Sequence, residues 1–81
     1  MWLHLFWSGI LTLLVNIPIS SFLSINLIRN DGNLDTNIYK KFTEQGENTI
    51  QLNLDKYMPG SYILKLNALN YEKTFKVIIS K

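Results

Sequence analysis

Oxygen-bearing side chains cluster in the stretch DGNLD, where they occupy the first, third and fifth positions of residues 31–35. That spacing is typical of the start of a calcium-binding loop, whose ligands are carboxylate and amide oxygens. The rest of the loop is missing, because Thr36 stands where glycine makes the sharp turn and Phe42 stands where a bidentate glutamate is needed. We therefore interpret the stretch as a hairpin turn in which Asp31 and Gly32 supply the positive φ angles.

The other reactive side chains form no catalytic or metal-binding pattern. The chain has no cysteine, which excludes thiolate catalysis, disulfides and cysteine-ligated zinc. Its one histidine, His4, stands in the apolar N-terminal run, remote from any plausible pair of serine and aspartate partners. The acids lie in or beside predicted turns, where a solvated or capping role is usual. Eight basic residues are scattered among six acids, for a net charge of +2, which is not the footprint of a nucleic-acid-binding protein. The sequence predicts a protein that is not an enzyme and needs no cofactor or metal.

The 81 residues give room for one small domain, preceded by a segment of different character. From residue 2 to residue 15 the chain is apolar and carries no charge. That run is shorter than the about 20 residues of a membrane span and has the length of a signal-peptide core. We assign residues 1–20 to an apolar leader-like segment and residues 21–81 to the folded domain. Two interpretations of the segment stay open: a signal-like or membrane-associated helix with membrane contact through residues 2–15, or a supply of apolar side chains to the domain.

From residue 22 onward, apolar side chains recur with a period of two, which is typical of strands with one buried face. Four strands are expected, with the inward faces Leu23, Ile25 and Leu27; Ile50, Leu52 and Leu54; Tyr62, Leu64, Leu66 and Ala68; and Phe75, Val77 and Ile79. A fifth strand is predicted at residues 37–43, whose paired lysines indicate a sheet edge. With turn signals between the strands, the pattern predicts an all-β fold, a small antiparallel immunoglobulin-like β-sandwich preceded by the apolar N-terminal segment.

The last apolar residues, Val77, Ile78 and Ile79, stand almost at the C-terminal carboxylate. Terminal backbone is poorly ordered unless something ties it down. We therefore expect the final strand to be built into a sheet.

Residues 46–81 resemble the type A C-terminal sorting domain of proteins exported by the type IX secretion system of Bacteroidota. That family shows a strand with alternating Leu or Ile, a short helical turn, the sequence pG-x-Y, a hairpin, and a closing strand with a basic residue before several Ile or Val. Here Pro59, Gly60 and Tyr62 match the pG-x-Y element, and KVIISK at residues 76–81 matches the closing strand. Gly32 is similar to the glycine of the family's early turn, and residues 18–25 resemble the family's opening motif.

The resemblance implies a non-catalytic secretion signal that is recognised by the outer-membrane translocon and cut by a sortase-like processing enzyme. The protein would then be secreted or held at the cell surface after passing through the periplasm. Because no cargo precedes the domain in this sequence, we expect it to be detached from, or truncated of, its cargo. The alternative is a free-standing small secreted or envelope sandwich used for adhesion or structural binding. The residues that carry the resemblance are Gly32, Pro59, Gly60, Tyr62, Lys76, Val77, Ile78, Ile79 and Lys81.

Overall fold

The computed structural model describes residues 2–5 and 9–79, and for residues 2–5 it gives the course of the backbone. The described chain contains seven strands and no helix. The strands are β1 (Trp2–Leu5), β2 (Ile10–Ile17), β3 (Ser21–Arg29), β4 (Asp35–Thr43), β5 (Gly46–Asn53), β6 (Gly60–Ala68) and β7 (Tyr71–Ile79). The predicted all-β fold is confirmed.

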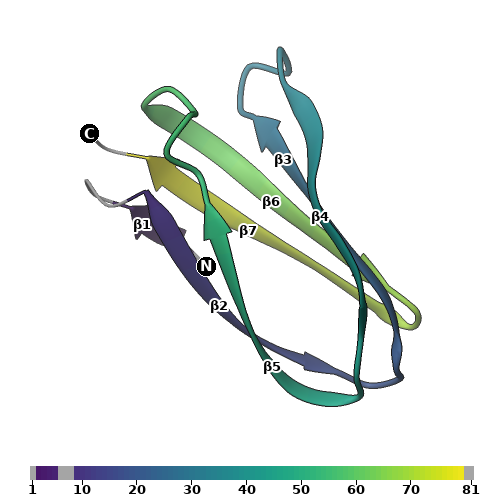
Figure 1. Cartoon of the computed structure of the whole chain (residues 1–81). Helices are drawn as coiled ribbons and strands as arrows, with labels where there is room; N and C mark the ends of the chain where they lie inside the picture. The colour runs from purple at the N-terminus through teal and green to yellow at the C-terminus, as the bar shows by residue number, and fades with distance from the viewer. Residues whose placement is uncertain (1, 6–8, 80–81) are drawn as a thin grey trace.

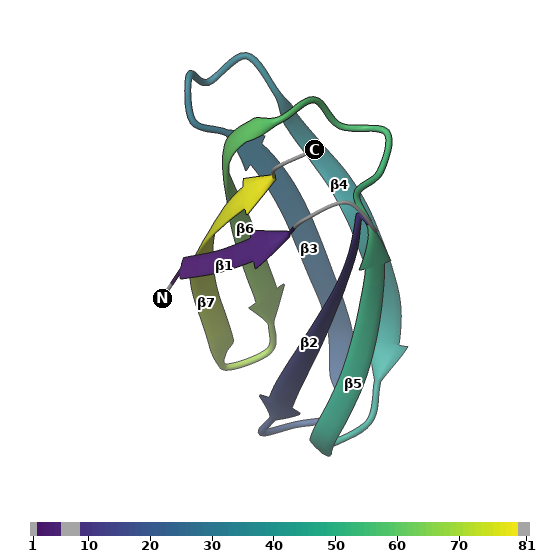
Figure 2. The same cartoon turned by 90° about the vertical axis from the view of Figure 1, so that its left-hand side faces the viewer.

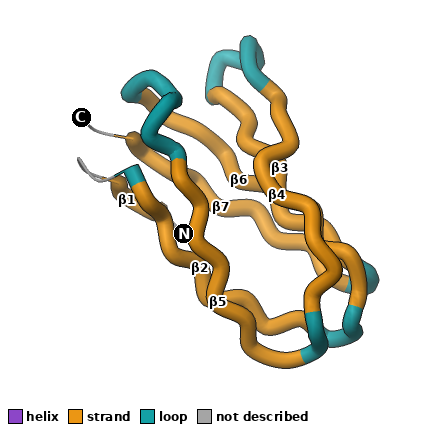
Figure 3. Tube along the Cα trace, in the orientation of Figure 1, coloured by secondary structure: helices purple, strands orange, loops and turns teal. Residues whose placement is uncertain are grey.

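The strands form two sheets, a larger one in the order β1-β7-β6-β3-β4 and a smaller one of β2 and β5. All neighbouring strands are antiparallel except β1 and β7, which run parallel. The smaller sheet lies across one face of the larger one (Figure 1), and the two layers are seen again after a quarter turn (Figure 2). The connections are confined to the two ends of the strands (Figure 3). This arrangement is consistent with the predicted sandwich.

The core lies between the two sheets, and its buried apolar side chains come from five strands, β2, β3, β5, β6 and β7, and from Leu54 just after β5. Its fully buried members include Leu23, Ile25 and Leu27 of β3, Leu64 and Leu66 of β6, and Val77 of β7. The faces predicted from the period of two are therefore confirmed, although Ala68 and Phe75 are only partly buried at the rim of the cluster. Burying these side chains removes apolar surface from water, which is the main force that holds a domain without disulfides together.

The apolar N-terminal segment contributes a strand to this core. All eight residues of β2 pair with β5, from Ile10 opposite Asn53 to Ile17 opposite Gly46. Along β2 exposed and buried residues alternate, so that the inward side chains complete the cluster between the sheets. Of the two interpretations left open, residues 10–17 thus follow the second. The described part of the chain contains no helix long and apolar enough to cross a membrane.

The predicted edge strand and the predicted closing strand are both found in the larger sheet. β4 forms one edge of the sheet, and its register with β3 shifts between Ile25 and Asn26. β7 lies inside the sheet, between β6 and β1. The last described residue, Ile79, pairs with both Gly60 and Leu5, so the expectation that the end of the chain is built into a sheet holds up to this residue. Lys81 lies outside the described residues.

Candidate recognition surface

Three segments that are distant in the sequence meet at one end of the sandwich. The pairing of β6 with β7 sets Gly60 opposite Ile79 and Ser61 opposite Ile78. The turn between β3 and β4 joins them, because the Asn30 amide donates a hydrogen bond of 3.0 Å to the Ser61 carbonyl. We call residues 30–33, 58–62 and 76–79 the motif end. It holds the described residues that were named as carrying the resemblance, Gly32, Pro59, Gly60, Tyr62 and residues 76–79, whereas residues 18–25, which resemble the opening motif, lie outside it.

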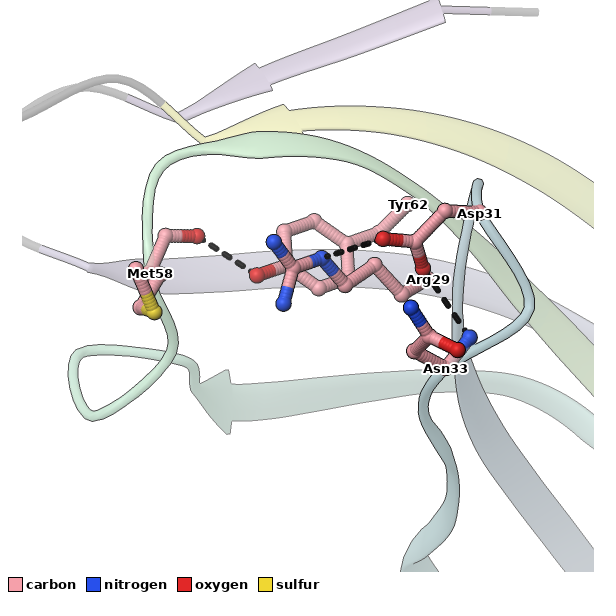
Figure 4. Close-up of polar contacts among 5 residues, drawn as sticks. All are labelled: Arg29, Asp31, Asn33, Met58 and Tyr62. Atoms are coloured by element: carbon pink, nitrogen blue, oxygen red, sulfur yellow. Dashed lines mark hydrogen bonds and ion pairs between the residues drawn. The ribbon is translucent and has the colours of Figure 1, made fainter.

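Tyr62 fastens the loop between β5 and β6 to the sheet. Its side chain is only 2% exposed, and its hydroxyl donates a hydrogen bond of 2.6 Å to the Met58 carbonyl (Figure 4). The ring also meets the Tyr57 ring edge-on, with the centroids 6.4 Å apart. One side chain therefore combines apolar packing with a polar tie to the loop, which is a common use of buried tyrosine.

The loop itself contains a single turn, closed by a hydrogen bond of 3.1 Å from the Tyr57 amide to the Leu54 carbonyl. Pro59 then leads into Gly60, whose φ is +153°. A side chain at this position would find room, since its Cβ would come no closer than 3.9 Å to the Tyr62 ring. The backbone conformation, and not the available space, is what requires glycine there.

The turn between β3 and β4 uses its acid for its own structure. Asp31 Oδ1 accepts a hydrogen bond of 2.9 Å from the Asn33 amide, and Asp31 Oδ2 lies 3.4 Å from Arg29 Nε (Figure 4). The Gly32 amide donates to the Arg29 carbonyl at 2.9 Å, with a φ of +80° at the glycine. The stretch forms the predicted turn, and Gly32 has the expected positive φ. The expectation of a positive φ at Asp31 is wrong: Asp31 keeps a negative φ and stabilises the turn through its side chain, which accepts from the Asn33 amide. Among the described residues, no three acidic or histidine side chains come together as a metal site would require.

The residues of β7 at the motif end divide between core and surface. Val77 and Ile79 are buried between the sheets, whereas Lys76 and Ile78 lie on the outer face, with Lys76 exposed. Lys76 borders a hollow of about 120 Å³, together with Asn30, Ser61, Tyr62 and Ile63. Pockets that hold small organic ligands are usually about 300–1,000 Å³. This end of the molecule is therefore better suited to contact with another protein than to enclosing a substrate.

Sequence reasoning missed the backbone atoms that hold the motif end together. The carbonyls of Met58 and Ser61 accept the hydrogen bonds that join the loop and the turn to β6. Any residue can offer a carbonyl, so the side-chain pattern contains no signal for these acceptors. The Arg29–Asp31 contact was missed as well, although a basic and an acidic residue on either side of a predicted turn could have suggested it.

A comparison with family models finds a match over residues 8–80, described as a secretion system C-terminal sorting domain. The chain belongs to this family, the C-terminal sorting domains of the type IX secretion system, which confirms the resemblance noted in the sequence. Such a domain is a non-catalytic secretion signal; it implies secretion across the outer membrane and interaction with the type IX machinery. No curated protein and no solved structure matches the chain.

Proposed function

We propose that the motif end is the surface by which the outer-membrane translocon recognises this sorting domain. The observation that carries the proposal is the meeting of three motif segments at one end, through the Asn30–Ser61 hydrogen bond and the pairing of Gly60 with Ile79. Segments that are distant in the sequence must lie together to form one recognised surface, and the segments that carry residues 32, 59–62 and 76–79 lie together at this end.

The motif residues have two different roles in this proposal. Tyr62, Val77 and Ile79 are buried and set the shape of the end, while Gly32 and Gly60 allow the backbone conformations of its turns. Lys76 and Ile78, on the outer face, make the direct contact with the translocon, and Lys81 stays a predicted contact. After export, a sortase-like enzyme processes the protein, which passes through the periplasm and ends at the cell surface or in the medium.

The test fuses residues 1–81 behind a periplasm-directed reporter in a bacterium with type IX secretion. The intact fusion is expected outside the cell, and export should stop in a strain that lacks the translocon. Lys76→Glu is expected to reduce export, because it reverses a charge at the proposed contact. Lys65→Glu is the matched control: it makes the same charge change on an exposed residue of the same sheet, opposite Thr74 and away from the motif end.

Two outcomes would contradict the proposal. Equal export of the two lysine variants, both folded by circular dichroism, would remove the motif end as the recognised surface. Export of the intact fusion in the strain without the translocon would favour the free-standing secreted sandwich. Removing residues 76–81 should leave the reporter in the periplasm, since that deletion takes away the Val77 and Ile79 side chains as well as the contact residues. Mass spectrometry of the exported reporter reveals whether it has been cut.

A further inference from the structure

A hollow opens on the side of the sandwich where β2 and β7 face each other. Its volume is about 520 Å³. Its lining comes from both sheets: Thr12, Leu13, Leu14 and Asn16 of β2, and Tyr71, Lys73 and Phe75 of β7. β1 crosses between β7 and β2 only beside the end of β7, where it pairs with residues 76–79 (Figure 2). Among the described strands, none pairs with the outer edge of residues 71–75, and this is where the hollow lies.

The edge of β2 that borders this hollow has backbone groups available for pairing. The ladder between β2 and β5 begins with a hydrogen bond from the Leu54 amide to the Gly9 carbonyl. In an antiparallel pair, alternate residues direct their N–H and C=O groups toward the partner strand. Because Gly9 directs its carbonyl toward β5, residues 12, 14 and 16 direct their N–H and C=O groups away from β5. In the described part of the chain, no strand pairs with β2 on that side.

This edge lacks the features that usually keep an exposed edge from pairing. Within β2 there is no charged residue and no proline, and its register with β5 is unbroken. Leu14, on its outer face, is 70% exposed. The outer edge of the larger sheet differs, because β4 carries Lys40 and Lys41 and has a register shift with β3. Charges and bulges protect edge strands, and a regular edge without them is a template for another strand.

We propose that the edge of β2 at residues 12–16 binds an extended peptide segment of a partner protein, which adds a third strand to the smaller sheet. On the face of the bound peptide that points into the hollow, apolar side chains lie over Tyr71 and Phe75. An acidic side chain between these two apolar ones places its carboxylate against Lys73. None of the described residues that line the hollow is acidic, so Lys73 gives the site a preference for negative charge. Backbone hydrogen bonds supply affinity in such an added strand, and the alternate side chains supply selectivity.

A second copy of this chain does not fit the same edge. Because β7 residues line the hollow beside β2, the larger sheet extends past the β2 edge. Two copies joined through their β2 edges would bring their larger sheets into collision. A single strand takes about 4.8 Å of width in a sheet, and the hollow has the volume of a typical ligand pocket. The site therefore selects one extended segment.

The test titrates the 15N-labelled chain, residues 1–81, with a blocked heptapeptide of sequence Thr-Val-Thr-Glu-Thr-Val-Thr, followed by NMR. Its Val, Glu and Val side chains share one face, as the hollow requires. The amide signals of Thr12, Leu14 and Asn16 are expected to shift and to gain protection from exchange. The peptide with Lys in place of Glu is expected to bind about tenfold more weakly, because a repulsion replaces the ion pair.

Three variants make the result specific. Lys73→Glu should reverse the preference between the two peptides. Leu14→Pro should abolish binding, since it removes an outward N–H that an edge strand does not need for its own sheet. Leu14→Ala is the matched control, because it also removes the leucine side chain but keeps the backbone N–H. This variant should still bind the peptide.

Absence of peptide binding, an unchanged preference in Lys73→Glu, or equal binding by the two Leu14 variants would overturn the proposal. Signal shifts that depend on protein concentration without peptide would replace it with self-association. The assay contains no secretion machinery, and the export test changes no residue of β2. A failure here is therefore distinguishable from a failure of the proposed recognition surface.

Discussion

Replacing Tyr62 with phenylalanine tests how firmly the loop at the motif end is held. The substitution keeps the buried ring and removes the hydroxyl that donates to the Met58 carbonyl at 2.6 Å. A hydrogen bond of this kind contributes about 0.5–1.5 kcal/mol to stability. Met58 lies in an exposed loop, so water can donate a hydrogen bond to its carbonyl in place of the tyrosine hydroxyl. No buried polar group is then left without a hydrogen-bond partner. We therefore expect a loss of about 1 kcal/mol.

That loss is large for a domain of this size. Stabilities of about 0.05–0.15 kcal/mol per residue give a chain of 81 residues about 4–12 kcal/mol in all. A loss of about 1 kcal/mol lowers the Tm of such a domain by about 4–8 °C. Tyr62→Ala, which also removes the ring, should cost about 3–5 kcal/mol and leave the fold close to unfolding.

The assay is urea unfolding of residues 1–81, followed by circular dichroism. Tyr62→Phe should lower the midpoint without changing the slope of free energy against urea, because the folded and unfolded surfaces are unchanged. Tyr57→Phe is the matched control: its ring contacts the same tyrosine, but its hydroxyl makes no hydrogen bond among the described residues. A wild-type midpoint for Tyr62→Phe, or an equal loss in both variants, would show that the hydrogen bond does not hold the loop.

Three further changes have defined outcomes. Deleting residues 1–17 removes the four buried side chains of β2, whose burial contributes about 6–12 kcal/mol to stability in all. The remaining fragment should therefore show the circular dichroism spectrum of an unfolded chain, and a folded spectrum would refute this. Gly60→Val should lower stability by about 1–3 kcal/mol in thermal unfolding, because φ is +153° there, and an unchanged Tm would contradict the strain argument. Burial raises the pKa of Tyr71 above 10.0, so the unfolded chain loses the hydroxyl proton at a lower pH than the folded chain, and stability should fall as pH rises above 10. Tyr71→Phe should lessen that fall when urea unfolding is measured at several pH values. An unaltered pH profile in this variant would contradict the argument.

Alternation in the sequence was enough to predict the strands after residue 20 and the faces they bury. Leu23, Ile25 and Leu27 are separated by polar residues. An alternation of apolar and polar residues with a period of two indicates a strand with one buried face. The same reasoning failed for β2. Its outward residues include Ile10 and Leu14, which are as apolar as its inward ones, so no period was visible and a helix remained an alternative. Only the pairing with β5 decided that this run is a strand.

The motif residues could be named from the sequence because glycine, proline and tyrosine at these spacings resemble a family pattern. Their meeting at one end could not be predicted, because it depends on backbone groups such as the Ser61 carbonyl and on the register of β6 with β7. The parallel pairing of β1 beside β7, and the hollow beside the part of β7 with which β1 does not pair, likewise depend on contacts between the two ends of the chain. Side-chain chemistry determined which residues face the core, whereas long-range strand pairing determined which of them share a surface.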